Sequence, residues 1–110
     1  MSRADAERLD DIRSAVTRCL AYRDHLDSAE HSSMAYDAIL RNLAVIGEAV
    51  KALPTDVKQQ HPGVPWASIA GLRDVVVHED FRVDPAMVKD VVDNQLALML
   101  DELPQDAEGQ

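Results

Sequence analysis

Two long stretches of this chain repeat apolar residues at steps of three and four, and this period constrains the fold more than any other feature. Residues spaced in this way share one face of an α-helix. Over residues 4–27 they are Leu9, Ile12, Val16, Cys19, Leu20 and Leu26, and over residues 34–52 they are Tyr36, Ile39, Leu40, Leu43, Ile46 and Val50. We therefore expect two long amphipathic helices. They are joined by a polar turn over residues 28–33, where Ser32 or Ser33 would cap the second helix.

The remaining segments predict three further helices. A short helix is expected over residues 54–60, followed by a loop over 61–65, which holds two prolines and a glycine. Residues 66–78 are predicted as helix, because a single strand would have no partner, although three consecutive valines favour one. Asp84 followed by Pro85 is a strong helix start, so the last helix should cover residues 85–102. Its expected inward residues are Met87, Val88, Val91, Val92, Leu96, Met99 and Leu100.

These elements predict an all-α fold, an up-down bundle of four main helices plus a short helix. A chain of 110 residues fits one domain, which we place at residues 1–103, with a disordered polar tail at 104–110. Only four residues are aromatic, so aliphatic side chains and alanine should build the core. Trp66 is expected in that core or at an interface between protomers.

Charge and cysteine usage exclude several classes of protein. The net charge of −9 disfavours non-specific DNA coating, which depends on contacts to phosphate. Cys19, the single cysteine, lies on an apolar stripe and should be a buried, inert thiol. Besides His78, the chain has His25, His31 and His61, and no two of its histidines are four residues apart. No metal site is therefore expected. No cofactor is expected either. No apolar run approaches a membrane span, and we expect a cytoplasmic protein.

Arg73 stands five residues before His78, and this pair is the main candidate for chemistry. An arginine binds phosphate through a planar fork of donors, and a histidine moves protons near neutral pH. Together they are a minimal set for cutting a phosphodiester without a metal. Five helical residues turn about 140°, so the two side chains converge only if the helix ends near His78. A surface arginine and a helix-terminal histidine with no catalytic role fit the spacing too, and the residues alone leave both readings open.

Four residues are candidates for a supporting role at this site. Asp74 is placed to orient the arginine or the histidine, and Asp80 favours the charged form of the nearby imidazole. Asn42 and Glu48, with Arg41, would line a cleft beside the fourth helix. Asp74, Asn42 and Glu48 also fit ordinary solvated or capping residues.

The order of these segments resembles the HepT-like branch of the HEPN-domain proteins, which are small helical toxins. The resemblance covers about residues 5–103. Its pieces are Arg-Asn-Leu-Ala-Val-Ile-Gly-Glu-Ala-Val-Lys at 41–51, Pro-Gly-Val-Pro-Trp at 62–66, Gly-Leu-Arg-Asp at 71–74, and Val-His at 77–78 with Asp84 after it. The arginine–histidine element alone is weakly specific, but its place in this order is quite specific.

The resemblance implies a metal-independent endoribonuclease that acts as the toxin of a toxin–antitoxin system. It implies a homodimer in which Arg73 and His78 of both chains meet in one cleft and act on RNA. A second chain would also add positive charge to a segment that, from Arg73 to Arg82, has two bases and three acids. The implied antitoxin is an MntA-type nucleotidyltransferase.

One position departs from the family pattern. HepT proteins carry a tyrosine two positions after the histidine, and the antitoxin adenylylates it, whereas this chain has Asp80 there. A carboxylate offers no hydroxyl for a stable phosphodiester, so we expect that modification to be absent at this site. The partner would then restrain the toxin by direct binding or by modification elsewhere. The alternative is a catalytically silent HEPN module that binds a nucleotidyltransferase or a nucleotide, and composition alone supports only a structural helical dimer.

Overall fold

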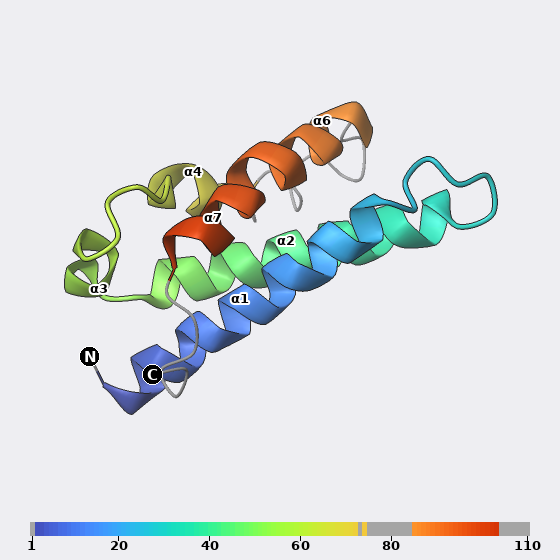
Figure 1. Ribbon diagram of the computed structural model, residues 1–110. Coiled ribbons are helices and arrows are strands. Elements are labelled where there is room, and N and C mark those ends of the chain that lie inside the picture. The colour runs from blue at the N-terminus through green and yellow to red at the C-terminus, as the bar shows by residue number, and fades with distance from the viewer. Residues whose placement is uncertain (1, 73, 75–84, 104–110) are drawn as a thin grey trace.

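The computed structural model describes residues 2–72, 74 and 85–103 of the chain. Every regular element in this part is helical, in the order α1, α2, α3, α4, α6, η1 and α7. Figure 1 shows α1 and α2 lying side by side, with α4 and the C-terminal helical segment packed above them. The predicted all-α bundle is therefore confirmed. The predicted tail at 104–110 lies outside the described residues.

The two long helices form an antiparallel pair that runs the length of the molecule (Figure 1). Helix α1 covers Arg3–Arg23, and Ser2 caps it by accepting the backbone N–H of Asp5 on its hydroxyl at 3.0 Å. Helix α2 covers Ser32–Ala52. The predicted stripes form the core between the helices, as shown by Ile12, Val16, Cys19, Ile39, Ile46 and Val50, each at most 1% exposed.

The connection between these helices differs from the expectation in two ways. Helix α1 ends at Arg23 rather than at residue 27, because the backbone N–H of His25 bonds to the carbonyl of Tyr22 in a tighter turn. Neither predicted serine caps α2. Its N-cap is His31, whose side chain makes no capping hydrogen bond. Ser28 closes the turn instead, since its hydroxyl accepts the His31 N–H at 3.1 Å and its carbonyl accepts the Ser32 N–H at 3.0 Å.

Two short helices follow α2. Helix α3 covers Thr55–Gln59 and α4 covers Trp66–Ala70, with the predicted loop between them. The indole Nε1 of Trp66 donates to the carbonyls of Lys58 and His61, both at 3.0 Å, and so fixes the start of α4 against the end of α3. The predicted helix over 66–78 is thus confirmed for Trp66–Ala70 but is wrong in continuing unbroken, because α4 ends there with Gly71 as its C-cap. Residues 73 and 75–78 lie outside the described residues.

The C-terminal helix has the predicted limits but not the predicted regularity. Helix α6 covers Pro85–Asp90, a π-helical segment η1 covers Val91–Leu96, and α7 covers Ala97–Glu102. Its buried stripe is Val88, Val92, Leu96 and Met99, each at most 1% exposed. The prediction that Met87 faces inward is wrong, because its side chain is 47% exposed. The buried stripe begins at Val88 and proceeds through the π segment by steps of four, which leaves Met87 on the outer side.

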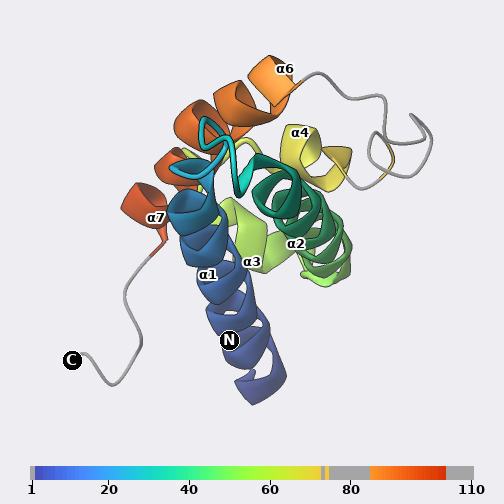
Figure 2. The ribbon, with the colours of Figure 1, turned by 90° about the vertical axis from the view of Figure 1, so that its right-hand side faces the viewer.

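In the end-on view of Figure 2, the C-terminal helical segment lies over α1 and α4 lies over α2. One hydrophobic core joins these layers, and Val57, Val64, Ile69 and Leu103 extend it to the short elements. Trp66 packs against this core, in agreement with one of the two places predicted for it. Among the described helices, none combines the length and apolarity that a membrane span requires.

The π segment brings Asp93 into a two-point ion pair with Arg23 of α1. The guanidinium donates from Nε to Oδ1 and from Nη2 to Oδ2, the second bond at 2.9 Å. These hydrogen bonds hold the pKa of the Asp93 carboxyl below its usual value. The unfolded value is about 3.9, so the pair's contribution to stability is complete above about pH 4 and is lost as the pH falls through the lower folded pKa.

We therefore expect Asp93→Asn to be less stable than the unmodified protein at neutral pH, and the difference to shrink as the pH falls below about 4. Urea unfolding at a series of pH values measures this. In the Arg23→Gln background the same substitution should have little pH-dependent effect, because the charge partner is gone. A difference that stays constant down to strong acid would show that the pair is not what lowers the carboxyl pKa.

Candidate functional site

Of the predicted site residues, Arg73, His78 and Asp80 lie outside the described residues, whereas Asp74, Asn42 and Glu48 lie within them. The structure therefore defines the supports of the predicted catalytic segment. Those supports are α4 with residue 74 on one side and α6 on the other.

The support before the segment rests on α2. Ile69 of α4 is fully buried and Leu72 is 9% exposed, so both anchor this part of the chain in the core. Asp74 is exposed, and its Oδ1 lies 3.4 Å from Nζ of Lys51 near the end of α2. Both side chains face solvent, so this pair stabilises the fold little. The pair does fix a position, because it holds the Asp74 carboxylate and the Lys51 ammonium group side by side on the surface.

The support after the segment approaches the turn that follows α1. Val88 of α6 is 1% exposed and belongs to the core. Lys89 Nζ lies 3.1 Å from Oδ2 of Asp27, in the turn that follows α1. The described residues before the segment thus approach Lys51, and those after it approach the α1–α2 turn.

Asn42 is buried at 8% exposure and faces α1. Its Oδ1 accepts from Nε of Arg18 at 3.1 Å, and its Nδ2 donates to the carbonyl of Ala38 at 2.8 Å. The bond with Arg18 joins α1 to α2, whereas the bond with Ala38 lies within α2. The first bond gives Asn42 a role in holding the two long helices together, and its predicted support of the site remains a prediction.

Glu48 is exposed and lies three residues before Lys51 on α2. Residues at this spacing are neighbours on a helix surface, so Glu48 is one turn from the point where Asp74 meets Lys51. It also borders a shallow groove, whose lining residues are Arg8, Ala44, Val45, Glu48, Ala49 and Ala52. Of the predicted supporting residues, Glu48 and Asp74 are therefore the two that the described contacts bring to one region.

Cys19 is fully buried, and burial raises the pKa of its thiol to about 12. The thiolate, which is the reactive form, is therefore scarce at neutral pH. This buried environment agrees with the prediction that Cys19 is an inert thiol. In the described part of the chain, no three or more histidine, cysteine or acidic side chains form a group that could hold a metal ion.

Sequence reasoning missed a second feature, at the opposite end of α2 from Lys51. The rings of His25 and His31 lie edge to face, with centroids 5.9 Å apart, and with Tyr22 and Met34 they border a pocket. Their sequence spacing gave no signal of this contact, because it arises only when the turn after α1 folds back onto α2. The signal that was available is the placement of two histidines and a methionine around a predicted turn.

Comparison with known proteins gives a consistent result. The model of the HepT-like family, described as "Ribonuclease HepT-like", matches residues 6–105. A Thermococcus cleftensis protein named "Probable ribonuclease HepT" is 36% identical over 90 residues, which cover 76% of this chain and 78% of that protein. "Putative RNase MJ0127" of Methanocaldococcus jannaschii is 40% identical over 76 residues, which cover 66% of this chain and 63% of that protein, less than two thirds of its length. No solved structure matches the chain significantly.

The buried thiol gives a direct test of the core. We expect Cys19 to react very slowly with a disulfide reagent such as Ellman's reagent in the native protein, and rapidly once the protein is unfolded in denaturant. The rise in absorbance of the released thiolate measures this. As a control, Val45→Cys introduces a thiol at a position that is 45% exposed, and this thiol should react at once. Fast reaction of Cys19 in the native state would contradict its burial.

Asn42→Ala tests whether the amide is structural. Losing its hydrogen bonds to Arg18 and Ala38 should lower the free energy of unfolding by about 1–2 kcal/mol in urea denaturation. Asn94→Ala is the matched control, because Asn94 is exposed and bonds within its own helix to Asp90. The control should change stability by less than about 0.5 kcal/mol. Equal stability of both variants would leave the Asn42 bonds without a structural role.

Proposed function

This chain belongs to the HepT-like ribonuclease family, and we propose that it cleaves RNA through Arg73 and His78 without a metal ion. The observation that carries the proposal is the extent of the family match, residues 6–105, which includes both residues. Relatives that carry ribonuclease names add support. Lys51 pairs with Asp74 at 3.4 Å, so its ammonium group would be available to a phosphate in exchange for that carboxylate.

The proposed reaction uses the 2′-hydroxyl of RNA as the nucleophile. One His78 takes the proton of that hydroxyl, and the oxygen attacks the adjacent phosphorus. Arg73 stabilises the negative charge that grows on the phosphate oxygens. A second His78 gives a proton to the leaving 5′-oxygen, and the P–O bond to that oxygen breaks. The products are a 2′,3′-cyclic phosphate and a free 5′-hydroxyl, so DNA is not a substrate.

Two histidines at one phosphate require two copies of the chain, so the proposal includes a homodimer. A two-fold axis brings the same surface of both protomers together and doubles every residue near it. It would add a second Arg73 to the cleft, so that two guanidinium groups could contact one phosphate. The same axis also doubles the neighbouring acids, so the gain lies in this pair of guanidinium groups and not in net charge.

In the cell, we propose that this ribonuclease is a toxin restrained by a nucleotidyltransferase antitoxin. Asp80 stands where the family pattern has the tyrosine that accepts AMP. Restraint therefore takes place by direct binding or by modification at another residue. Mass spectrometry of the co-expressed pair distinguishes these routes from the tyrosine-type modification, since AMP on the peptide that contains His78 and Asp80 would contradict the proposal.

A catalytically silent HEPN module is the second candidate function. The observations that favour it are Asp80 and the acidic net charge. Such a module would keep the helical bundle to hold a nucleotidyltransferase or a nucleotide. It differs from the ribonuclease in one measurable property, because it would release no RNA fragments at any concentration.

We expect the purified protein to cut single-stranded RNA in the presence of EDTA, and His78→Ala to reduce the rate by about 10²–10⁴-fold. Arg73→Ala should also reduce it strongly, because no other group would stabilise the phosphate charge in the same geometry. Fragment analysis on denaturing gels measures the rate, and mapping of the 3′ ends detects the cyclic phosphate. His61→Ala is the control, since it removes a histidine from the loop before α4.

Three results would change the proposal. If EDTA stops cleavage, the reaction depends on a metal. If His78→Ala retains the full rate, the activity belongs to another residue or to a contaminant. If neither the protein nor its induction in cells has any effect, the silent module is the better account.

A further inference from the structure

One ion pair lies beside the segment proposed to be catalytic, and it joins Lys51 of α2 to Asp74. The Lys51 ammonium group lies 3.4 Å from Oδ1 of Asp74. Asp74 directly follows Arg73, the arginine proposed to hold the phosphate of RNA. Among the described ion pairs, this one is the nearest in sequence to the proposed chemistry.

The fold itself keeps these two side chains together. Lys51 belongs to the last turn of α2, and its neighbour Val50 is fully buried. Leu72, two residues before Asp74, is 9% exposed and belongs to the same hydrophobic core. Figures 1 and 2 show α4, which leads into this part of the chain, lying along α2. The core therefore anchors both backbones, and the ion pair can open without moving either of them.

Opening the ion pair costs little, because both side chains face water. Their exposed fractions are 41% for Lys51 and 52% for Asp74, and a surface pair of this kind contributes little to stability. A phosphate oxygen offers the ammonium group the same kind of partner as the carboxylate, a negatively charged acceptor. A phosphate can therefore take the place of the carboxylate, which then turns to solvent.

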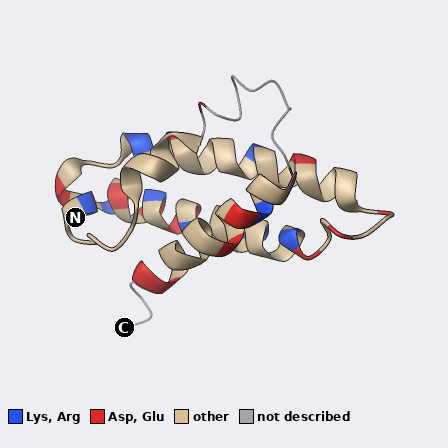
Figure 3. Cartoon of the chain, turned by 90° about the horizontal axis from the view of Figure 1, so that it is seen from above, with Lys and Arg blue, Asp and Glu red and all other residues tan. Residues whose placement is uncertain are grey.

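The charges around Lys51 determine what Asp74 does to an approaching phosphate. Glu48 lies one turn before Lys51 on the surface of α2, and Asp74 contacts the ammonium group directly. These three residues are one base and two acids, so they do not attract RNA by their net charge. Figure 3 likewise shows basic residues placed singly among acids along the helices. RNA can use the Lys51 charge only by displacing the carboxylate, and Asp74 therefore lowers the affinity.

We propose that Lys51 binds a backbone phosphate of single-stranded RNA, and that Asp74 competes with this phosphate for the ammonium group. The inference rests on the proposed ribonuclease function, which brings an RNA strand to Arg73. When the strand binds, one ion pair is exchanged for another. Asp74 is thus a built-in competitor, and only a strand that also makes other contacts, such as one with Arg73, displaces it.

This role for Asp74 differs from the orienting role predicted for it from the sequence. A carboxylate that orients Arg73 or His78 assists the chemical step, so its loss lowers kcat. A carboxylate that competes for Lys51 weakens binding, so its loss lowers the Kd for RNA. The two roles act on different constants, and measurements of binding alone report on the competition.

An RNA analogue that cannot be cut measures this competition without any ribonuclease activity. The probe is a fluorescently labelled oligoribonucleotide with 2′-O-methyl groups, which lacks the attacking hydroxyl, and fluorescence anisotropy gives its Kd. We expect Lys51→Ala to weaken binding about three- to tenfold and Asp74→Asn to tighten it about two- to fivefold. Lys51→Arg should bind within about twofold of the unmodified protein, because it keeps the positive charge.

A double substitution and a salt series separate competition from a general effect of charge. In the Lys51→Ala background, Asp74→Asn should change the Kd by less than about 1.5-fold, because the ammonium group for which it competes is gone. In the unmodified protein, the logarithm of the affinity should fall as the logarithm of the salt concentration rises. Lys51→Ala should make this slope shallower by about 0.7, the value for one phosphate contact on a single strand.

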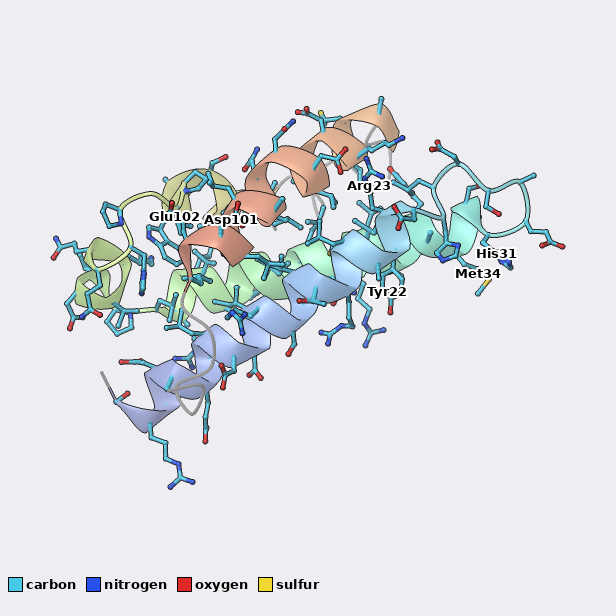
Figure 4. All side chains as sticks on the ribbon, viewed as in Figure 1. Tyr22, Arg23, His31, Met34, Asp101 and Glu102 are labelled. Carbon is cyan, nitrogen blue, oxygen red and sulfur yellow. The ribbon has the colours of Figure 1, made fainter. Side chains whose placement is uncertain are left out.

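Lys89 and Asp27 provide a matched control, because they form a second exposed pair of the same chemistry. Lys89 Nζ lies 3.1 Å from Oδ2 of Asp27. This pair is at the end of the bundle where Figure 4 shows Arg23 and His31, away from α3 and α4. Lys89→Ala and Asp27→Asn should each leave the Kd of the RNA analogue within about 1.5-fold of the original value. Urea unfolding checks that all the variants are folded.

Three results would overturn the proposal. Binding by Asp74→Asn that is no tighter than that of the unmodified protein would show that the carboxylate does not compete. An unchanged Kd and salt slope in Lys51→Ala would show that the lysine is not a phosphate contact, and so would the absence of binding by every form of the protein. The ribonuclease proposal is judged by cleavage alone. The expected shifts in a protein that cuts no RNA would therefore keep this contact and reject only the catalytic role.

Discussion

The antiparallel packing of α1 on α2 is the interaction on which the rest of the molecule depends. It buries the aliphatic stripes of two 21-residue helices and creates two adjoining surfaces. The C-terminal helical segment covers α1, and α4 covers α2. Leu72 and Val88 are both buried in the core that includes this pair. The pair therefore holds the described residues on both sides of the segment predicted to be catalytic.

The π segment belongs to a helix that keeps one stripe of side chains buried and also makes polar contacts with two neighbouring helices. The C-terminal helix must keep one stripe in the core while it reaches α1 and α4 with polar side chains. Asp93 reaches Arg23 of α1, and Gln95 accepts a hydrogen bond from the Ser68 hydroxyl of α4 at 2.9 Å. The wider turn of a π-helix changes the direction of successive side chains. These polar contacts therefore tie α4, which precedes Arg73, to the layer that covers α1.

Local patterns predicted most of the fold, and contacts between distant residues account for what was missed. The stripe from Ile39 to Val50 identified α2 because burial on one face imposes its period directly on the sequence. The π segment gave no such signal, and Met87, an apolar residue next to the buried stripe that begins at Val88, was wrongly placed inside. At the site, the sequence singled out Arg73 and His78 by chemistry and order. It gave no indication that Asn42 would bond to Arg18, because that contact depends on how two helices face each other.

Charge is unevenly placed in this molecule, and its distribution bears on the proposed ribonuclease site. Asp24, Asp27 and Glu30 lie at the turn between α1 and α2, at the opposite end of α2 from Lys51. At physiological ionic strength the Debye length is about 8 Å, so exposed charges farther apart are largely screened. Met34 and Lys51 are 17 residues apart on α2, which corresponds to about three such lengths. The net charge of −9 therefore says little about the region around Asp74, where Asp74 and Lys51 form an ion pair of their own.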